Sequence, residues 1–202
     1  MLDINKVHLM SNIDGTAAMD PESVNLVVTS PPYDNLRDYN DSSAWNWNTF
    51  TQVADGLVRV LKPGGVICWN VGDAVISDMM GKKSGPSLSG TSFKQCLHFM
   101  ELGLNFHDKL IYEKHAARFA SGVNSLRYTD IYEYVFVLSK GRPNTIELIR
   151  DKPNKGAGKV FKKDGGRGKD GSRIKGDGKV GVIHDFGVRH NIWRYVTSFG
   201  SG

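Results

Sequence analysis

A short apolar run that stops at two consecutive prolines constrains the fold of this chain most. Leu26-Val27-Val28 leads directly into Thr29-Ser30-Pro31-Pro32-Tyr33. Such a run is typical of a buried strand, and because proline cannot donate to a sheet ladder, the strand is expected to end at Thr29. A hydroxyl, a rigid turn and an aromatic ring therefore follow the carboxyl end of a strand, which is where ligands bind in open α/β sheets.

The chemistry that suits this turn is methylation of an exocyclic amine on a flipped base. Such an amine is conjugated with its ring, so it reacts better when acceptors hold its hydrogens. Ser30 Oγ and the carbonyl of Pro31 are candidate acceptors, and neither Pro31 nor Pro32 offers a competing N–H. Tyr33 is a candidate to stack on the extruded base. The structural alternative is a Pro-Pro turn that ends a strand beside a solvent-facing tyrosine.

The stretch Val28–Tyr33 resembles the catalytic motif of the amino-methylating DNA methyltransferases, which make N4-methylcytosine or N6-methyladenine. Four further stretches resemble that group, the first of them its phage and bacterial members: 34–40, 71–74, 90–95 and 132–137. The resemblance covers nearly the whole chain. It implies a circularly permuted order, in which the catalytic motif comes first and the glycine motif for the cofactor comes last.

The resemblance implies an α/β fold: a Rossmann-like methyltransferase sheet with a basic Gly/Lys-rich insertion. It also implies S-adenosylmethionine as cofactor, and Ser30 as a residue near both the cofactor and the target amine. Cytosine N4 is favoured over adenine N6 because serine usually precedes Pro-Pro in the cytosine enzymes. In relatives the first strand ends in a Gly-Asp pair near the cofactor, and Asn12 occupies that place here. A helix cap or turn is the alternative role of Asn12.

Hydrophobic periodicity predicts the other elements. Residues 4–10 alternate loosely and predict a strand. Apolar positions at helical spacing predict a helix over 49–61, ended by Pro63-Gly64-Gly65, with a buried strand over 66–71 after it. A second helix is expected to start at Thr91 or Ser92, and strands are expected over 104–112 and 131–138. The apolar face predicted for the second helix consists of Phe93, Cys96, Leu97 and Met100.

The composition changes after Arg150, where Gly, Lys, Arg and Asp dominate residues 151–181. The net charge of the chain is +5, which favours a polyanionic partner. We therefore expect a catalytic half over 1–150 and a partly flexible target-recognition segment over 151–202, with double-stranded DNA as partner. The candidate phosphate contacts are Arg37, Lys159, Lys162, Lys163, Arg167, Arg173 and Lys175. For each of them a solvated surface role is the alternative.

No stretch of the chain matches the F-x-G-x-G turn with which this family binds its cofactor. Phe199-Gly200-Ser201-Gly202 lacks the spacing. We therefore expect an incomplete sheet, without its cofactor-side strands. The expected partners are then a cofactor half, in cis or in trans, and a second copy of the chain in a homodimer. A non-catalytic DNA-binding fragment is the second hypothesis, and a methyltransferase for RNA or a protein amide is the third, although that group has Asn before Pro-Pro.

The two cysteines, Cys68 and Cys96, lie in apolar patterns with no CxxC or Cys/His cluster, so neither disulfides nor a metal are indicated. Free thiols fit a reducing cytoplasm. No signal peptide and no apolar run long enough for a bilayer is present, so no membrane partner is expected. A paired restriction enzyme is compatible with the resemblance.

Overall fold

The computed structural model describes residues 2–32, 45–76, 87–114, 128, 130–144, 147–162 and 165–195. They divide into two compact units, Met1–Ile146 with Asn191–Gly202, and Glu147–His190. The larger unit includes the chain after His190. The expected catalytic half over 1–150 and target-recognition segment over 151–202 stay a prediction.

The larger unit is built on one five-stranded sheet with the strand order β1-β2-β6-β5-β11. Its strands are β1 (Val24–Thr29), β2 (Leu61–Val71), β5 (Asn105–Lys114), β6 (Tyr132–Ser139) and β11 (Ile192–Tyr195). β1 runs parallel to β2, and β5 runs parallel to β11, whereas β6 is antiparallel to both of its neighbours. The two-residue strands β3 (Val75–Ile76) and β4 (Ser87–Leu88) pair with each other.

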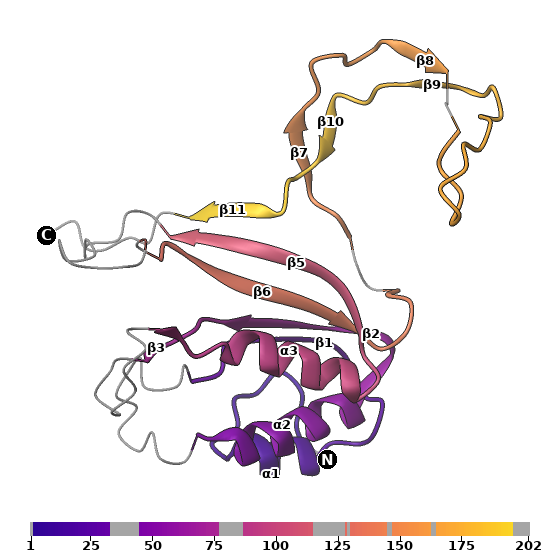
Figure 1. Ribbon diagram of the computed structural model, residues 1–202. Helices are drawn as coiled ribbons and strands as arrows, with labels where there is room; N and C mark the ends of the chain where they lie inside the picture. Colours follow the sequence, from indigo (N-terminus) through magenta and orange to yellow (C-terminus); the bar gives the residue numbers. More distant parts are fainter. Residues whose placement is uncertain are drawn as a thin grey trace, which may run out of the picture. The chain divides into compact units, whose positions relative to one another are not determined.

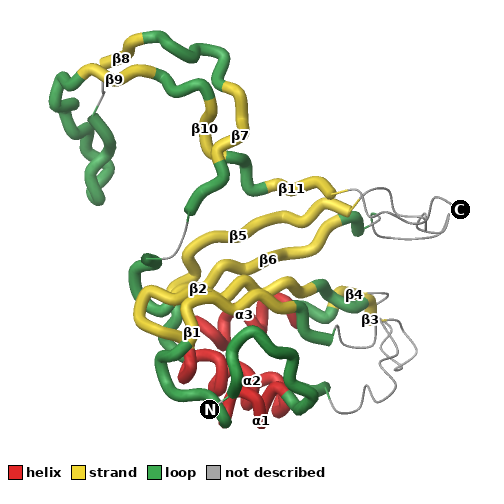
Figure 2. The backbone as a smooth tube through the Cα atoms, turned by 180° about the vertical axis from the view of Figure 1, so that it is seen from behind, coloured by secondary structure: helices red, strands yellow, loops and turns green. Residues whose placement is uncertain are grey.

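Three helices, α1 (Asn12–Ala17), α2 (Trp47–Val60) and α3 (Thr91–Glu101), lie on one side of this sheet (Figures 1 and 2). The core lies between them and the strands. Its largest fully buried side chains are Trp69 of β2, Phe50 of α2 and Phe99 of α3, whose rings meet edge to face at centroid distances of 5.1 to 5.9 Å. At the apolar spacing predicted for this helix, Phe50, Val53, Ala54 and Leu57 of α2 are buried and Val58 is half-buried. The strand–helix–strand unit expected from the sequence is thus confirmed.

Gly56 shows why α2 carries a glycine in its interior. A Cβ on Gly56 would lie 2.4 Å from Thr16 Oγ1 of α1, closer than real contacts allow. The two helices therefore approach each other directly at this point. Arg59 of α2 caps the carboxyl end of α1. Its guanidinium donates to the carbonyls of Thr16 and Met19 at 2.6 and 2.9 Å.

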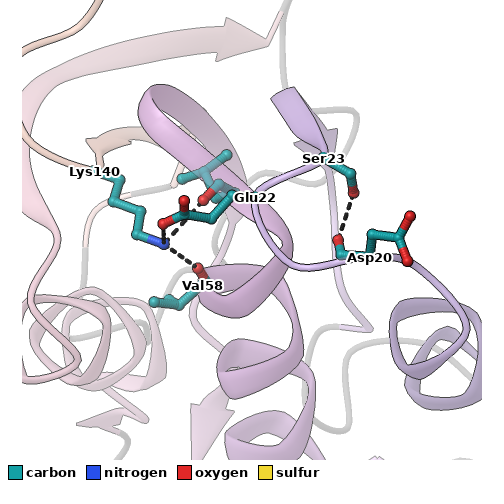
Figure 3. Close-up of polar contacts among 6 residues, drawn as sticks. Asp20, Glu22, Ser23, Val58 and Lys140 are labelled. Atoms are coloured by element: carbon teal, nitrogen blue, oxygen red, sulfur yellow. Dashed lines mark hydrogen bonds and ion pairs between the residues drawn. The ribbon is translucent and has the colours of Figure 1, made fainter.

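Lys140, just after β6, binds the backbone carbonyls at the end of α2 (Figure 3). Its ammonium donates to the carbonyls of Val58 and Leu61 at 3.2 and 3.0 Å, and pairs with Glu22 at 3.2 Å. A cation at the end of a helix satisfies carbonyls that lack an intrahelical partner. On the approach to β1, the Ser23 hydroxyl donates to the Asp20 carbonyl at 2.6 Å. These contacts fix the entry into β1, and hence the place of the turn that follows it.

Three sequence-based expectations are wrong in detail. Residues 4–10 form no strand: Val7 and Leu9 are fully exposed, so nothing pairs with or covers this stretch among the described residues. Pro63-Gly64-Gly65 lies within β2, which begins at Leu61 and is irregular there. Gly64 has φ +80°, which allows the chain to turn inside the strand.

The face that α3 buries also differs from the prediction. Phe99 is fully buried and Cys96 is buried, whereas the predicted Phe93, Leu97 and Met100 are 52%, 57% and 41% exposed. The helix is rotated because the buried Gln95 must reach the sheet, where its Oε1 accepts from the Trp69 indole N–H at 2.8 Å. A buried indole needs such an acceptor.

The smaller unit, Glu147–His190, is a two-stranded ribbon (Figure 1). β7 (Arg150–Pro153) pairs antiparallel with β10 (Phe186–Val188), and β8 (Val160–Lys162) pairs antiparallel with β9 (Val180–Val182). An isolated bridge between Arg167 and Arg173 continues it. None of its strand residues is buried, which is consistent with a composition too polar for a core of its own.

Candidate active site at the carboxyl edge of the sheet

The turn Ser30-Pro31-Pro32 lies where the sequence predicts it, directly after β1 ends at Thr29. Thr29 lies opposite Trp69 in the parallel register with β2. The turn therefore lies beside the end of β2, at the edge of the sheet where both strands terminate. Pro31 is buried, Pro32 is half-buried and Ser30 is exposed. The proline thus anchors the turn, and the serine is presented at the surface.

Asp73 organises the neighbouring end of β2. One oxygen of its carboxylate accepts from the Ser92 N–H at 2.9 Å, and the other accepts from the Ser92 hydroxyl at 2.6 Å. The Ser89 hydroxyl also donates to Asp73, at 3.3 Å. Asp73 therefore caps α3 from outside, since the residue before the helix is Gly90, which makes no side-chain cap. α3 starts at Thr91, as the sequence predicts, but its cap comes from Asp73, outside the helix.

We expect Asp73→Ala to lower the free energy of unfolding by about 2 kcal/mol, because the N–H of the fully buried Ser92 loses its acceptor. The urea midpoint measures the change. Asp55→Ala on the exposed face of α2 is the matched control and should shift stability by no more than about 0.5 kcal/mol. Equal effects of the two substitutions would contradict the capping role.

Two tyrosines reach the same edge from β6, because that strand is antiparallel. Tyr134 lies opposite Val71 of β2 and opposite Ile111 of β5. Its ring stacks on Phe136 at 5.4 Å, and its hydroxyl lies 3.5 Å from that of Tyr132. The side chain of Asn70 donates to the Tyr134 carbonyl at 3.1 Å. No local sequence signal gives this pair a site role, since only the antiparallel pairing of β6 brings it to this edge.

The hydrogen bond with Tyr132, burial and nearby negative charge raise the pKa of Tyr134 to about 12. The folded chain therefore favours the neutral phenol. The stability that this adds is fully present below the ordinary pKa of about 10 and is lost as the pH rises towards about 12. In an absorbance titration of tyrosinate we expect one late-titrating tyrosine, lost in Tyr134→Phe and kept in Tyr128→Phe. A single common transition near the ordinary tyrosine pKa would contradict this.

A cavity of about 360 Å³ opens between the first turns of α2 and α3, and it is lined by Trp45, Asn46, Trp47, Phe50, Thr91, Lys94 and Gln95. Both helices follow strands whose carboxyl ends lie at the same edge of the sheet as the turn. The cavity therefore lies at this edge of the sheet. None of Ser30, Pro31 and Pro32 lines it.

The other predicted site residues are not gathered at this edge. Asn12 is the first residue of α1, where Ser11 is the cap and accepts from the Asp14 N–H at 3.1 Å. Lys159, Lys162, Arg167, Arg173 and Lys175 are exposed residues of the ribbon unit. Tyr33, Arg37 and Lys163 lie outside the described residues.

The described residues hold no group of three His, Cys, Asp or Glu side chains suited to a metal. Burial raises the pKa of both free thiols, that of Cys96 to about 11. The helices of the described part of the chain are all too short or too polar to cross a membrane.

Comparison with known proteins agrees with this arrangement. Residues 24–193 match the profile of the N6/N4 DNA methylases. The chain belongs to the N6/N4 DNA methylase family. Its match begins at the first residue of β1 and runs to β11, so this DNA methylase match takes in the turn, Asp73, the tyrosine pair and the ribbon unit.

Among curated proteins, the chain is 44% identical over 173 residues to the orphan methyltransferase M.BamHII of Bacillus amyloliquefaciens, covering 85% of this chain and 59% of that protein. It is 29% identical over 138 residues to the type II beta methyltransferase M.BslI of Bacillus sp. strain NEB-606, covering 59% of this chain and 14% of that protein. The chain thus spans well under two thirds of the length of these DNA methylases.

Two solved structures share the fold. The cytosine-N4-specific PvuII DNA methyltransferase has a TM-score of 0.59 at 16% identity, over 96% of this chain and 58% of that chain. The DNA modification methylase TTHA0409 of Thermus thermophilus, in complex with S-adenosyl-L-methionine, has a TM-score of 0.51 at 21% identity, over 71% of this chain and 54% of that chain. The predicted Rossmann-like methyltransferase fold is confirmed.

Proposed function

We propose that this chain provides the catalytic edge of a DNA methyltransferase that moves a methyl group from S-adenosylmethionine to the N4 amine of cytosine. The observation that carries the proposal is the exposed Ser30 on a turn anchored by the buried Pro31, at the carboxyl edge of a methyltransferase sheet. Family membership and the cofactor in TTHA0409 support it. Serine before Pro-Pro favours cytosine over adenine.

In this proposal Ser30 Oγ and the Pro31 carbonyl accept the two hydrogens of the amine. The nitrogen lone pair is then released from the ring and points towards the methyl donor. Tyr33 stacks on the flipped base. The methyl group passes from sulfur to nitrogen, and the nitrogen then loses a proton to solvent. Orientation and polarisation supply the catalysis, so no strong general base is needed.

The chemistry of the cofactor is carried by its sulfonium group, which makes the methyl carbon electrophilic. Ser30 is the residue that we propose near it, whereas Asn12, which does not lie at the edge of the turn, is proposed to contact the adenine ring of the cofactor. Asn12 is exposed at the start of α1, so its amide is accessible to a ligand.

DNA contact is assigned to the ribbon. Glu147–His190 holds twelve Lys and Arg against six Asp and Glu, a net charge of +6, while the whole chain carries +5. The excess of positive charge is therefore confined to this unit. A two-stranded ribbon is narrow enough to enter the major groove. At the isolated bridge Arg167 faces Arg173, a pair of like charges that a polyanion would stabilise. Arg37 and Lys163 are proposed as further phosphate contacts.

The test is transfer of labelled methyl from S-adenosylmethionine to mixed-sequence DNA by the purified chain, alone and together with a polypeptide that supplies the part of M.BamHII outside the match. Label in DNA supports the proposal. Tight DNA binding without label in either mixture supports the second hypothesis, a non-catalytic DNA-binding fragment. We also propose that the chain works in the cytoplasm.

A further inference from the structure

One face of the strand pair β8 and β9 in the ribbon is made largely of exposed valines (Figure 1). Val160 lies opposite Val182, and Lys162 lies opposite Val180. Because side chains alternate along a strand and directly opposed residues share a face, these four residues lie on the same face of the ribbon. Val160, Val180 and Val182 are 67%, 60% and 55% exposed. We call this surface the valine face.

The opposite face of the same two strands is closed by its own side chains. Phe161 lies opposite Gly181, and its ring fills the space over that glycine, where a Cβ would lie 2.8 Å from the ring. Ile183 lies against Gly156 in the same way, at 3.1 Å from the position of a Cβ. Phe161 is accordingly less exposed, at 43%, than any of the three valines. The valine face is therefore the more open apolar surface of this strand pair.

Cations without a described counter-ion accompany the valine face. Lys162 lies on it, and Lys159 directly precedes β8. The ion pairs described within the ribbon unit use other cations, Lys179 and Arg189, so neither Lys159 nor Lys162 is paired with a described acidic residue. An apolar protein surface would desolvate these ammonium groups without neutralising them. The excess positive charge of the unit instead favours a polyanion as the occupant.

The major groove of DNA combines the two kinds of contact that this surface needs. Its edges are lined by phosphates, which lysines can contact without reading the sequence. At A·T pairs its floor presents the 5-methyl group of thymine, which apolar side chains contact. A valine side chain has no hydrogen-bond donor or acceptor, so this methyl group is the feature of a base edge that it can recognise.

We propose that the valine face is the base-reading surface of the ribbon, and that Val160, Val180 and Val182 contact thymine methyl groups in the major groove. The inference rests on the proposed contact between the ribbon and DNA. It deepens that function, because it names the face, the residues and the base pair that they select. The DNA sequence that the chain prefers should therefore contain A·T pairs.

The experiment selects duplexes from a random-sequence library by repeated binding to the chain, and then replaces single thymines of the selected duplex with uracil. Uracil pairs as thymine does and lacks only the methyl group, so the phosphate contacts are the same. We expect affinity to fall about fourfold for each methyl group that a valine covers. The slope of log affinity against log salt should not change, because the number of neutralised phosphates is the same.

The double variant Val160→Ala with Val182→Ala tests whether the valines recognise the methyl group. It should bind the thymine and uracil duplexes with equal affinity, while its salt slope matches that of the wild-type chain. Val7→Ala is the matched control, since Val7 is a fully exposed valine of the larger unit. This control should keep the wild-type ratio of the two affinities.

Equal affinity of the wild-type chain for the thymine and uracil duplexes would overturn the inference. So would a selection that enriches no A·T pairs, or a preference for thymine that survives undiminished in the double variant. The comparison of the two duplexes on the wild-type chain needs no variant and does not depend on how well the double variant folds. Failure to bind any duplex would instead contradict the proposed function, on which the inference rests.

Discussion

Ser30→Ala is expected to lower turnover by roughly 100-fold, the scale on which loss of one transition-state hydrogen bond acts in other enzymes. In the proposed mechanism the hydroxyl holds an amine hydrogen as the nitrogen becomes pyramidal, an interaction that strengthens only in the transition state. Affinity for DNA should therefore stay within about twofold. Single-turnover methyl transfer and a binding titration, made on the same DNA, measure the two quantities.

Ser23→Ala is the matched control for this substitution, because it removes a serine hydroxyl just before the opposite end of the same strand. That hydroxyl donates only to the Asp20 carbonyl in the described structure (Figure 3). We expect its turnover to stay near that of the wild-type chain. Parallel losses of turnover and DNA affinity in Ser30→Ala would assign Ser30 to binding and contradict the role as amine acceptor.

Removing the charges of the ribbon should have the largest effect on DNA binding. The variant replaces five exposed cations of the ribbon with glutamine: Lys159, Lys162, Arg167, Arg173 and Lys175. If each neutralises one phosphate, the slope of log affinity against log salt should fall by about 4.5. Affinity in dilute salt should then fall by roughly 100-fold or more. Titrations at several salt concentrations measure both.

The control compares two double variants. Replacing Lys6 and Lys109, two exposed cations of the larger unit, with glutamine should change the slope of log affinity against log salt much less than replacing Lys159 and Lys162 of the ribbon. Equal changes in the two double variants would show that binding follows overall charge and not the ribbon. An unchanged slope in the five-residue variant would remove the ribbon from the DNA interface.

Local sequence signals predicted the elements that surround the turn. The end of β1 at Thr29 follows from Pro31-Pro32, and α2 follows from apolar spacing that continues for three turns. These signals depend on residues close together in the chain, so they hold whatever the tertiary context. They were sufficient to place Ser30 at the carboxyl end of a strand.

The features that the sequence did not predict depend on contacts between residues that are far apart in the sequence. The side of α3 that is buried is set by the hydrogen bond between Gln95 and Trp69, 26 positions apart. The cap of α3 comes from Asp73, and Tyr134 reaches the site only because β6 lies antiparallel to β2. The strand pairs of the ribbon were also missed, because a segment with so few apolar residues gives no periodic signal.

The identity of the methylated base decides between transfer to cytosine N4 and transfer to adenine N6. DNA is incubated with the chain and a polypeptide that supplies the part of M.BamHII outside the match, then digested to nucleosides and resolved by mass spectrometry. We expect labelled N4-methylcytosine that depends on Ser30. Label in N6-methyladenine would contradict the assignment of cytosine, and label that persists undiminished in Ser30→Ala would contradict the site itself.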